Sequence, residues 1–562
     1  MGWWRATLAS GLLLLVGVPL LLPFADLLKH PSSWEVWREQ ARLLELAANT
    51  ALLVTGTLFL VLPCGVVAAV LFYRTDLPGR VLLRTLTLLT LFIPLPLFAS
   101  AWQAALEPLG WFPVPAWTGS PANVFEEIPV GLTGTLWLQG IGAAVWIHAM
   151  AGLPWVIWLV GQGLCWVERD LEEAALLDAA PLRVLWHVTL PRSGAALFAA
   201  GLWVTLQTAN EITVTDMVFL RTFAEEVYVQ MVRPDTGTGI EDIGLIQARA
   251  VAVTAPQIIL TLGLLFWTAR RMENRLPPRI TELSEPYWYQ LGGARWPVLA
   301  AVVAVVGLLL GVPLCSLVWR AGLAGNPETW SLATVGEHLT RVIQLQGKMI
   351  GQSVALAGIA GSVTAGLALV LCWLALEARW LYFSLLAILA LSWALPGPVV
   401  GIGLKETIAI LLDQVPSQTL AIALYYGPSP LPILWAFLLR LLPFGLALLW
   451  PIMRLLPREL RDAVRIDGAY GFQELRHLVG PLYASACVRV GVAVGVLSLG
   501  ELSASKLVAT PGSQTFSQML FDRMHYGVTN EVAALCLVLL SLVMLGGLVV
   551  IGLVRWKVPA IF

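Results

Sequence analysis

Five ionisable side chains stand inside long apolar runs of the sequence: Glu211, Asp216, Arg440, Glu501 and Lys506. A charge in an apolar run is costly to bury, so it usually has a partner or a function. Glu211 of "NEITVTD" and Glu501 of "GELSASK" occupy matching places in two similar segments. This match favours a symmetric structural or gating role over recognition of a substrate, and it leaves both roles open.

The sequence offers no residues for catalysis, metal binding or ATP hydrolysis. Its six cysteines occur singly, without the C-x-x-C spacing of a zinc or redox site, and its histidines form no acid–base cluster. Lys348 is the only lysine that follows a glycine, and Met349 comes after it, so the chain has no G-x-x-x-x-G-K-[ST] phosphate-binding loop. It also has no feature of a nucleic-acid-binding protein. We therefore expect no catalytic residue, no metal and no bound cofactor in this chain.

Two polar segments of the chain repeat each other. Residues 152–191 resemble residues 441–481 at an offset of 289, which becomes 290 after one inserted residue in the second copy. The matched pairs are Arg169 with Arg458, Glu173 with Asp462, Ala174 with Ala463, Asp178 with Asp467, Ala179 with Gly468, and Pro191 with Pro481. We call residues 169–191 the first loop and residues 458–481 the second loop.

Each loop mixes charged and apolar residues in a way that predicts a short amphipathic helix. Arg169 with Glu173, and Arg458 with Asp462, have the i,i+4 spacing at which opposite charges meet on a helix face. Small residues such as Ala175 leave a face that another protein can approach closely. A helix lying in the lipid headgroup layer is the alternative, but such an anchor needs no duplicated pattern of acidic, small and proline residues.

Prolines interrupt two of the apolar runs at corresponding places. They are Pro94 and Pro96 in "FIPLPLF", and Pro396 and Pro398 in "ALPGPVVGIG". A broken membrane helix releases backbone groups that a cavity can use, so these prolines are candidates for a translocation path or gate. A simple packing kink is the other interpretation.

The elements that carry these residues are predicted to be membrane helices. Of the 562 residues 58% are hydrophobic and only 12% are charged, which is more apolar surface than the core of a soluble protein can hide. Runs of about 20 apolar residues predict spans centred near residues 18, 60, 92, 150, 207 and 258, then 307, 362, 392, 443, 495 and 543. We expect an all-α integral membrane protein with about 12 transmembrane helices, the first of them a retained span and not a signal peptide.

The distribution of Lys and Arg predicts the orientation of these spans, because cytoplasmic loops retain positive charge. The stretch 107–136 has neither residue. The basic clusters are Arg74, Arg80 and Arg84; Arg169, Arg183 and Arg192; Arg270, Arg271, Arg275 and Arg279; Arg454, Arg458, Arg461, Arg465 and Arg476; and Arg555 with Lys557. An even number of spans puts them all on one side, so both loops and both termini are expected to be cytoplasmic. The halves, 1–280 and 281–562, would then be parallel six-helix repeats.

The two loops resemble the signature of the binding-protein-dependent ABC transporter permeases, which reads E-A-A, three residues, G, about nine more and an apolar-x-L-P ending. The first copy, "EAALLDAAPLRVLWHVTLP", has Ala179 in place of the glycine and is one residue short. The second, "DAVRIDGAYGFQELRHLVGP", keeps Gly468 but replaces E-A-A with Asp462, Ala463 and Val464. The resemblance covers nearly the whole chain as two fused permease domains.

This resemblance implies a type I ABC importer permease fold in a bacterial cytoplasmic (inner) membrane. It implies two copies of an ABC ATPase subunit that bind ATP and Mg²⁺ and receive the loops as coupling helices, and a periplasmic or lipid-anchored solute-binding protein. The architecture is most similar to ferric-iron importers, with thiamine, phosphonate or polyamine as alternative solutes. An ion-driven secondary transporter with 12 spans is the alternative of another class, but it predicts ionisable residues in mid-span and no docking loops.

Overall fold

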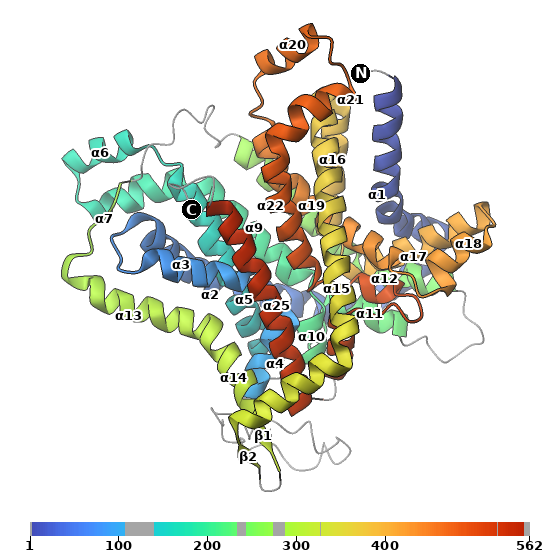
Figure 1. Cartoon of the computed structure of the whole chain (residues 1–562), viewed down its shortest axis with the longest axis horizontal. Helices are drawn as coiled ribbons and strands as arrows, with labels where there is room; N and C mark the ends of the chain where they lie inside the picture. Colours follow the sequence, from blue (N-terminus) through green and yellow to red (C-terminus); the bar gives the residue numbers. More distant parts are fainter. Residues whose placement is uncertain are drawn as a thin grey trace.

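The computed structural model describes residues 3–106, 140–232, 243–273, 287–325, 328–524 and 527–555, and these are almost entirely helical (Figure 1). Their two strands, β1 (Leu323–Ala324) and β2 (Thr329–Trp330), form one short antiparallel hairpin. The expected domain boundary at residue 280 lies outside the described residues, as do the stretch 107–136, Arg275, Arg279 and Lys557.

The helices follow the apolar runs of the sequence. In the first half they are α1 (Trp3–Lys29), α2 (Gln40–Arg74), α3 (Arg80–Leu89), α4 (Leu95–Leu106), α5 (Ile141–Cys165), α6 (Arg169–Asp178), α7 (Pro181–Val184), α8 (Leu190–Arg192), α9 (Gly194–Ala209), α10 (Thr213–Met217), α11 (Phe223–Val232) and α12 (Ile243–Glu273). In the second half they are α13 (Arg295–Val306), α14 (Val312–Ala321), α15 (Leu332–Ala375), α16 (Arg379–Ala394), α17 (Gly397–Gln414), α18 (Gln418–Ala421), α19 (Leu431–Met453), α20 (Arg458–Ile466), α21 (Phe472–Glu474), α22 (Gly480–Ser498), α23 (Ser505–Val508), α24 (Phe516–Met524) and α25 (Asn530–Arg555).

Several of these helices are long and apolar enough to cross a membrane, which is consistent with a multi-pass membrane protein. Among the described residues nine meet this test, and the number rises to 11 if each of two bent helix pairs counts as one span. The bent pairs are the runs centred near 92 and 392, where the chain turns by 106° and 117°. The run near 207 forms α9, which has only 16 residues. The helical fold is therefore confirmed and is compatible with a membrane protein, while the layout of 12 spans in two repeats stays a prediction.

Equivalent helices of the two halves pack in the same way. Helix α2 packs against α5 and α9, and α15 packs against α19 and α22. Glycine makes the second of these packings possible, because a Cβ atom on Gly361 of α15 would lie 2.1 Å from the carbonyl oxygen of Gly491 in α22. Close helix approach at small residues is a common way of packing helices inside a membrane.

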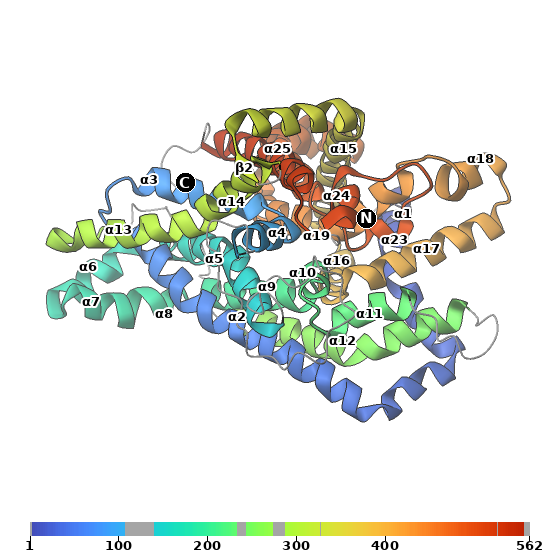
Figure 2. The same ribbon diagram turned by 90° about the horizontal axis from the view of Figure 1, so that it is seen from below.

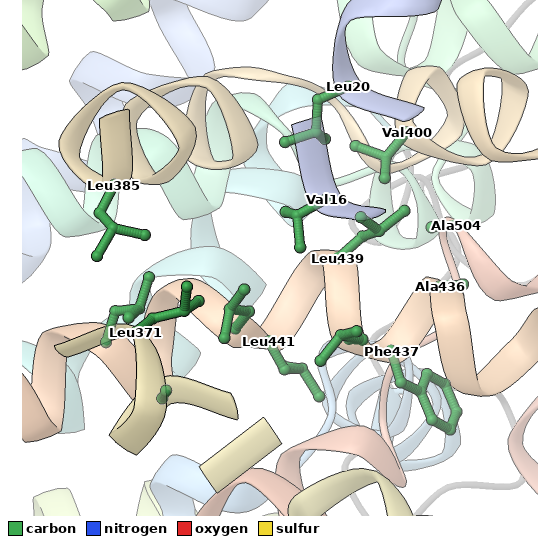
Figure 3. Packing of buried hydrophobic residues seen from close by; sticks show 14 of the residues in the cluster. Val16, Leu20, Leu371, Leu385, Val400, Ala436, Phe437, Leu439, Leu441 and Ala504 are labelled. Atoms are coloured by element: carbon green, nitrogen blue, oxygen red, sulfur yellow. The ribbon is translucent and has the colours of Figure 1, made fainter. Parts of the chain in front are cut away.

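The first helix of each half packs against the other half. Helix α1 lies against α16 and α17, while α13 and α14 lie against α3 and α4 (Figures 1 and 2). Figure 3 shows Val16 and Leu20 of α1 beside Val400 of α17 and Leu439 of α19, within one continuous buried cluster. The two halves are therefore interlocked, and a cavity between them is bounded by helices of both.

Candidate functional site

The two loops have the same succession of helical elements. Helix α6 begins at Arg169 and α20 begins at Arg458, the positions that the repeat pairs. Each loop then turns into one π-helical turn, Leu185–Thr189 or Leu475–Val479, before its proline and the following long helix. Figure 1 shows α6 and α20 at the edge of the helical body, well away from the β1–β2 hairpin. The predicted amphipathic helices are therefore present at both places.

The loops also expose matching side chains. Leu177 is 88% exposed, and its repeat equivalent Ile466 is 85% exposed. Leu182 and Phe472 form a second matched pair, at 67% and 65%. The same outward faces carry the acidic pairs and the small residues: Glu173, Ala174 and Asp178 in the first loop, and Asp462, Ala463 and Asp467 in the second, while Ala175 is half-buried. Each loop thus presents protruding apolar side chains beside carboxylates.

The two loops differ at the turn after the short helix. Gly468 has φ +82°, a conformation that glycine adopts without strain, and Gly471 has φ +63°. Ala179, which stands in place of that glycine in the first loop, is extended with φ −141°. The inserted residue of the second loop therefore lies in a turn that needs glycines, and the first loop takes a shorter route that alanine can follow.

Only one of the two expected helix-surface ion pairs is formed. Arg169 Nε lies 2.6 Å from Glu173 Oε1. Within the described part of the second loop, Arg458 and Asp462 form no ion pair, so the second half of that prediction is wrong. Two other arginines of α20, Arg461 and Arg465, point inward and bind the carboxylate of Glu377. Pro191 and Pro481 are exposed in the first turn of the helix that follows each loop.

A cavity of about 240 Å³ lies between the two halves. It combines apolar side chains with a few polar ones, the character of many small-molecule sites. Its lining residues are Leu91, Phe92, Ile93, Pro94, Leu95, Pro96, Trp155, Trp203, Leu206, Gln207, Asn210, Glu211, Ile212, Thr213, Trp393, Arg440, Leu441, Phe444, Leu497, Gly500, Glu501, Leu502 and Ser503. Both matched glutamates and the first proline pair thus meet at one place.

Four aromatic rings form one wall of this cavity. The ring of Trp203 lies 5.0 Å from Trp155, 5.1 Å from Phe444 and 5.7 Å from Trp393, measured between centroids. Trp155 and Phe444 are repeat equivalents and lie 6.4 Å apart. Edge-to-face and tilted ring pairs at these distances attract each other. The cluster joins the two halves across the middle of the protein.

The aromatic cluster lies on the side of the cavity that faces the loops. Along α9, which starts next to the first loop, Trp203 comes before Asn210 and Glu211. Along α19, which leads into the second loop, Phe444 comes after Arg440. The rings therefore separate the polar part of the cavity from the two loops.

Each of the two matched glutamates caps a short helix. Glu211 accepts hydrogen bonds from the backbone of Thr213 at 2.7 Å and of Val214 at 2.9 Å, and from the Thr213 hydroxyl. Glu501 accepts them from the backbone of Ala504 at 2.9 Å and of Ser505 at 3.2 Å, and from the Ser503 hydroxyl at 3.1 Å. A carboxylate at a helix N-terminus satisfies amide groups that have no partner in the helix.

Replacing either glutamate with glutamine is expected to lower stability. The amide keeps one accepting oxygen and places an NH₂ donor against backbone N–H donors, which costs about 1–3 kcal/mol per orphaned group. Glu211→Gln and Glu501→Gln should lower the unfolding temperature of the protein in detergent by similar amounts, whereas Glu35→Gln at an exposed position should not. Unfolding is followed by tryptophan fluorescence. Unchanged stability of both variants would contradict the capping role of these carboxylates.

The proline breaks contact the opposite half. Pro94 packs against Gly500, where an added Cβ would lie 2.8 Å from the proline Cγ. Asn210, the repeat equivalent of Gly500, holds the second break. Its Nδ2 donates to the carbonyl oxygen of Trp393 at 2.8 Å. Pro94 and Pro96 line the cavity, whereas Pro396 and Pro398 lie outside its lining, at the start of α17. Both breaks are thus next to the cavity, although only one proline pair faces it.

The other buried charges have local partners. Arg440 Nη1 donates to the carbonyl oxygen of Leu395 at 3.1 Å, in the second proline break. Lys506 pairs with Asp522 at 2.9 Å and shares a small pocket with Asp216. Among the described residues no group of three or more His, Cys, Asp or Glu could hold a metal ion.

The sequence did not single out the aromatic cluster, because a tryptophan in an apolar run is equally suited to face lipid. The match of Trp155 with Phe444 across the repeat was the one available signal. Comparison with known proteins gave no match to a family model, a curated protein or a solved structure.

Proposed function

We propose that the chain is the permease subunit of an ATP-driven ABC importer, with two fused permease domains. The observation that carries this proposal is the pair of equivalent loops, which present matched aliphatic side chains, Leu177 and Ile466, beside matched carboxylates. Two equivalent surfaces suit two copies of one partner. In this account the partner is an ABC ATPase subunit, and each loop is a coupling helix.

The chemistry of the exposed faces supports a protein partner over the lipid headgroup layer. Amphipathic helices that lie in the headgroup layer carry mainly Lys and Arg on the polar face. Here the outward faces mix acidic residues, Glu173 and Asp178 or Asp462 and Asp467, with exposed arginines next to the protruding aliphatic groups. Protruding apolar groups with a polar rim are typical of a protein–protein contact.

The cavity supports passage of a solute between the two halves. It lies between the proline breaks, it contains Arg440 and Gln207, and the aromatic cluster closes it toward the loops. Three of its lining residues have a buried polar atom with no partner among the described residues: Nε1 of Trp203, Nε1 of Trp393 and Oε1 of Gln207. Such atoms gain hydrogen bonds when water or a polar solute enters. We propose alternating access in which movement of the loops opens and closes the aromatic wall.

ATP is hydrolysed by the partner subunits in this proposal, because the sequence has no phosphate-binding loop. ATP and Mg²⁺ bind there, and a separate binding protein delivers the solute from outside the bacterial inner membrane. Both termini and both loops are placed on the cytoplasmic side, and the 12 spans form two parallel repeats.

Ferric iron is the solute that we propose first, because the sequence of residues 501–537 is similar to that of ferric-iron importer permeases. Selection belongs mainly to the binding protein, since Glu211 and Glu501 already accept three hydrogen bonds each from their own loops. These hydrogen bonds also count against an ion-driven transporter, because such a transporter needs carboxylates that release and take up protons or cations during transport.

Cysteine cross-linking tests the docking of the loops. Leu177→Cys and Ile466→Cys, each in the full chain with its native cysteines replaced, should form a disulfide with a cysteine in the cleft of the ATPase subunit in isolated membranes. A cysteine at Leu332, which is 71% exposed beside the hairpin, serves as the control. Absence of the cross-link at both loops in a complex that hydrolyses ATP would contradict the proposal.

A further inference from the structure

Each loop is tied to its own half by ion pairs on its inner face. In the first half, Arg74 Nη2 lies 2.7 Å from Glu172 Oε1, and both side chains are fully buried. In the second half, Arg461 lies 2.8 Å from Glu377 and 3.0 Å from Glu474. Arg465 contacts the same two carboxylates.

The two anchors occupy equivalent positions. Glu172 and Arg461 are paired by the repeat offset of 289. Positions on α2 and α15 can be matched through their contacts with Val156 and Gly445, which the same offset pairs. Val156 packs on Gly65 of α2, and Gly445 packs on Ala368 of α15, so Gly65 and Ala368 are equivalent. Arg74 lies nine residues after Gly65, and Glu377 lies nine residues after Ala368.

The charges of the two anchors are exchanged. The first half has arginine at the end of the long helix and glutamate in the loop, whereas the second half has glutamate at the helix end and arginine in the loop. We propose that Arg74 and Glu377 are positioning residues that fix each loop to its own half, and that the exchanged charges exclude the wrong pairing. A loop placed on the other half would bring Arg74 to Arg461, or Glu377 to Glu172, and like charges at contact repel each other.

Tyr289, at the beginning of the second half, reinforces the first anchor. The Tyr289 backbone donates to the carbonyl oxygen of Arg74 at 2.8 Å and accepts from the amide of Asp76 at 3.3 Å. Its phenol lies 3.0 Å from the Thr189 hydroxyl and 3.4 Å from Glu172 Oε1, and Thr189 also donates to Glu172 at 2.5 Å. Burial raises the pKa of the Tyr289 phenol, so it stays protonated and can donate. In the second anchor, Arg465 adds contacts to Glu377 and Glu474.

The role of the anchors in transport rests on the proposed function. A loop that is fixed to the end of α2 or α15 moves with that helix, so a push from an ATPase subunit reaches the helices around the cavity. The anchors themselves are independent of this role, and they can be measured in the isolated chain.

Charge exchange within the first half tests the anchor. Hydrogen exchange of the α6 amides is measured on the purified full chain in detergent, without ATPase subunits. Arg74→Glu should speed this exchange by about tenfold or more, because it places like charges in a buried contact. The double variant Arg74→Glu with Glu172→Arg copies the arrangement of the second half and should return the exchange to within about threefold of the wild type.

The control is Arg38→Glu, which reverses one member of an exposed ion pair with Glu35 and should leave α6 unchanged. If Arg74→Glu fails to accumulate in membranes, recovery of the yield by the double variant becomes the readout. A double variant no better than the single one, or a single variant with wild-type exchange, overturns the proposal. If the exchange responds as expected but no ATP hydrolysis co-purifies with the wild-type chain, the anchor stands and the proposed function fails.

Discussion

Replacing Leu177 and Ile466 together with aspartate is expected to abolish association of the chain with the ATPase subunits that we propose as its partners. Both side chains are more than four-fifths exposed and make few contacts within the chain, so the variant should fold normally. In the complex each would enter a cleft of the partner. Loss of the buried aliphatic area costs about 1.5–3 kcal/mol at each loop, and burying an unpaired carboxylate adds to this. Affinity should therefore fall by more than about a hundredfold.

The measurement is MgATP hydrolysis that elutes with the affinity-tagged chain from detergent-solubilised native membranes. Leu332→Asp is the matched control, since Leu332 is also an exposed leucine and begins α15, where an acidic residue is tolerated. Each single substitution should give an intermediate loss, because two loops share the contact. Full ATPase recovery with the double variant would exclude the loops as the docking surfaces.

Replacing Trp203 with alanine is expected to open the protein between the cavity and the loops. Trp203 contacts the other three rings of the cluster, so its removal leaves the remaining rings without their common neighbour. A large-to-small change at such a position costs about 3–5 kcal/mol and leaves space for water. Proteoliposomes that contain the variant should leak small ions at least about tenfold faster than the wild type.

Two substitutions control for this leak. Trp203→Phe keeps a ring in the cluster and should stay closed. Trp267→Ala removes a tryptophan that is 45% exposed, lies 6.1 Å from Phe198 and does not line the cavity. Leak measurements use a trapped fluorescent dye that reports ion entry. If Trp203→Ala is as tight as Trp267→Ala, the aromatic cluster does not close the path.

The short helices of the two loops could be predicted from the sequence because local patterns determine them. Arg169 and Arg458 start helices where the sequence changes from apolar runs to charged residues alternating with small and apolar ones. The broken spans were also predictable, since Pro94 and Pro396 cannot donate a helical hydrogen bond. The missing ion pair between Arg458 and Asp462 shows the limit of such reasoning. Spacing permits that pair, but the structure does not form it, and the other two arginines of the helix bind Glu377 and Glu474.

Contacts between distant segments could not be predicted in this way. Arg74 was read only as a marker of the cytoplasmic side, although it is fully buried against Glu172. Its partner is 98 residues away, and no local pattern connects the two. Trp155, Trp203 and Trp393 come from three helices, and their hydrophobicity is the same whether they face lipid, a neighbouring helix or a cavity. Glu211 was singled out as a charge in an apolar run, but only the structure reveals that its carboxylate caps a helix.

Transport in a defined membrane tests most directly the claim that ATPase subunits drive solute through this chain by way of the two loops. The chain is reconstituted into proteoliposomes with its co-purified ATPase subunits, and iron-55 is presented as the ferric ion on the binding protein. The account predicts uptake that requires ATP on the ATPase side and that persists when ionophores remove proton and sodium gradients. Uptake by the chain without ATPase subunits, or uptake driven by an ion gradient without ATP, would contradict it.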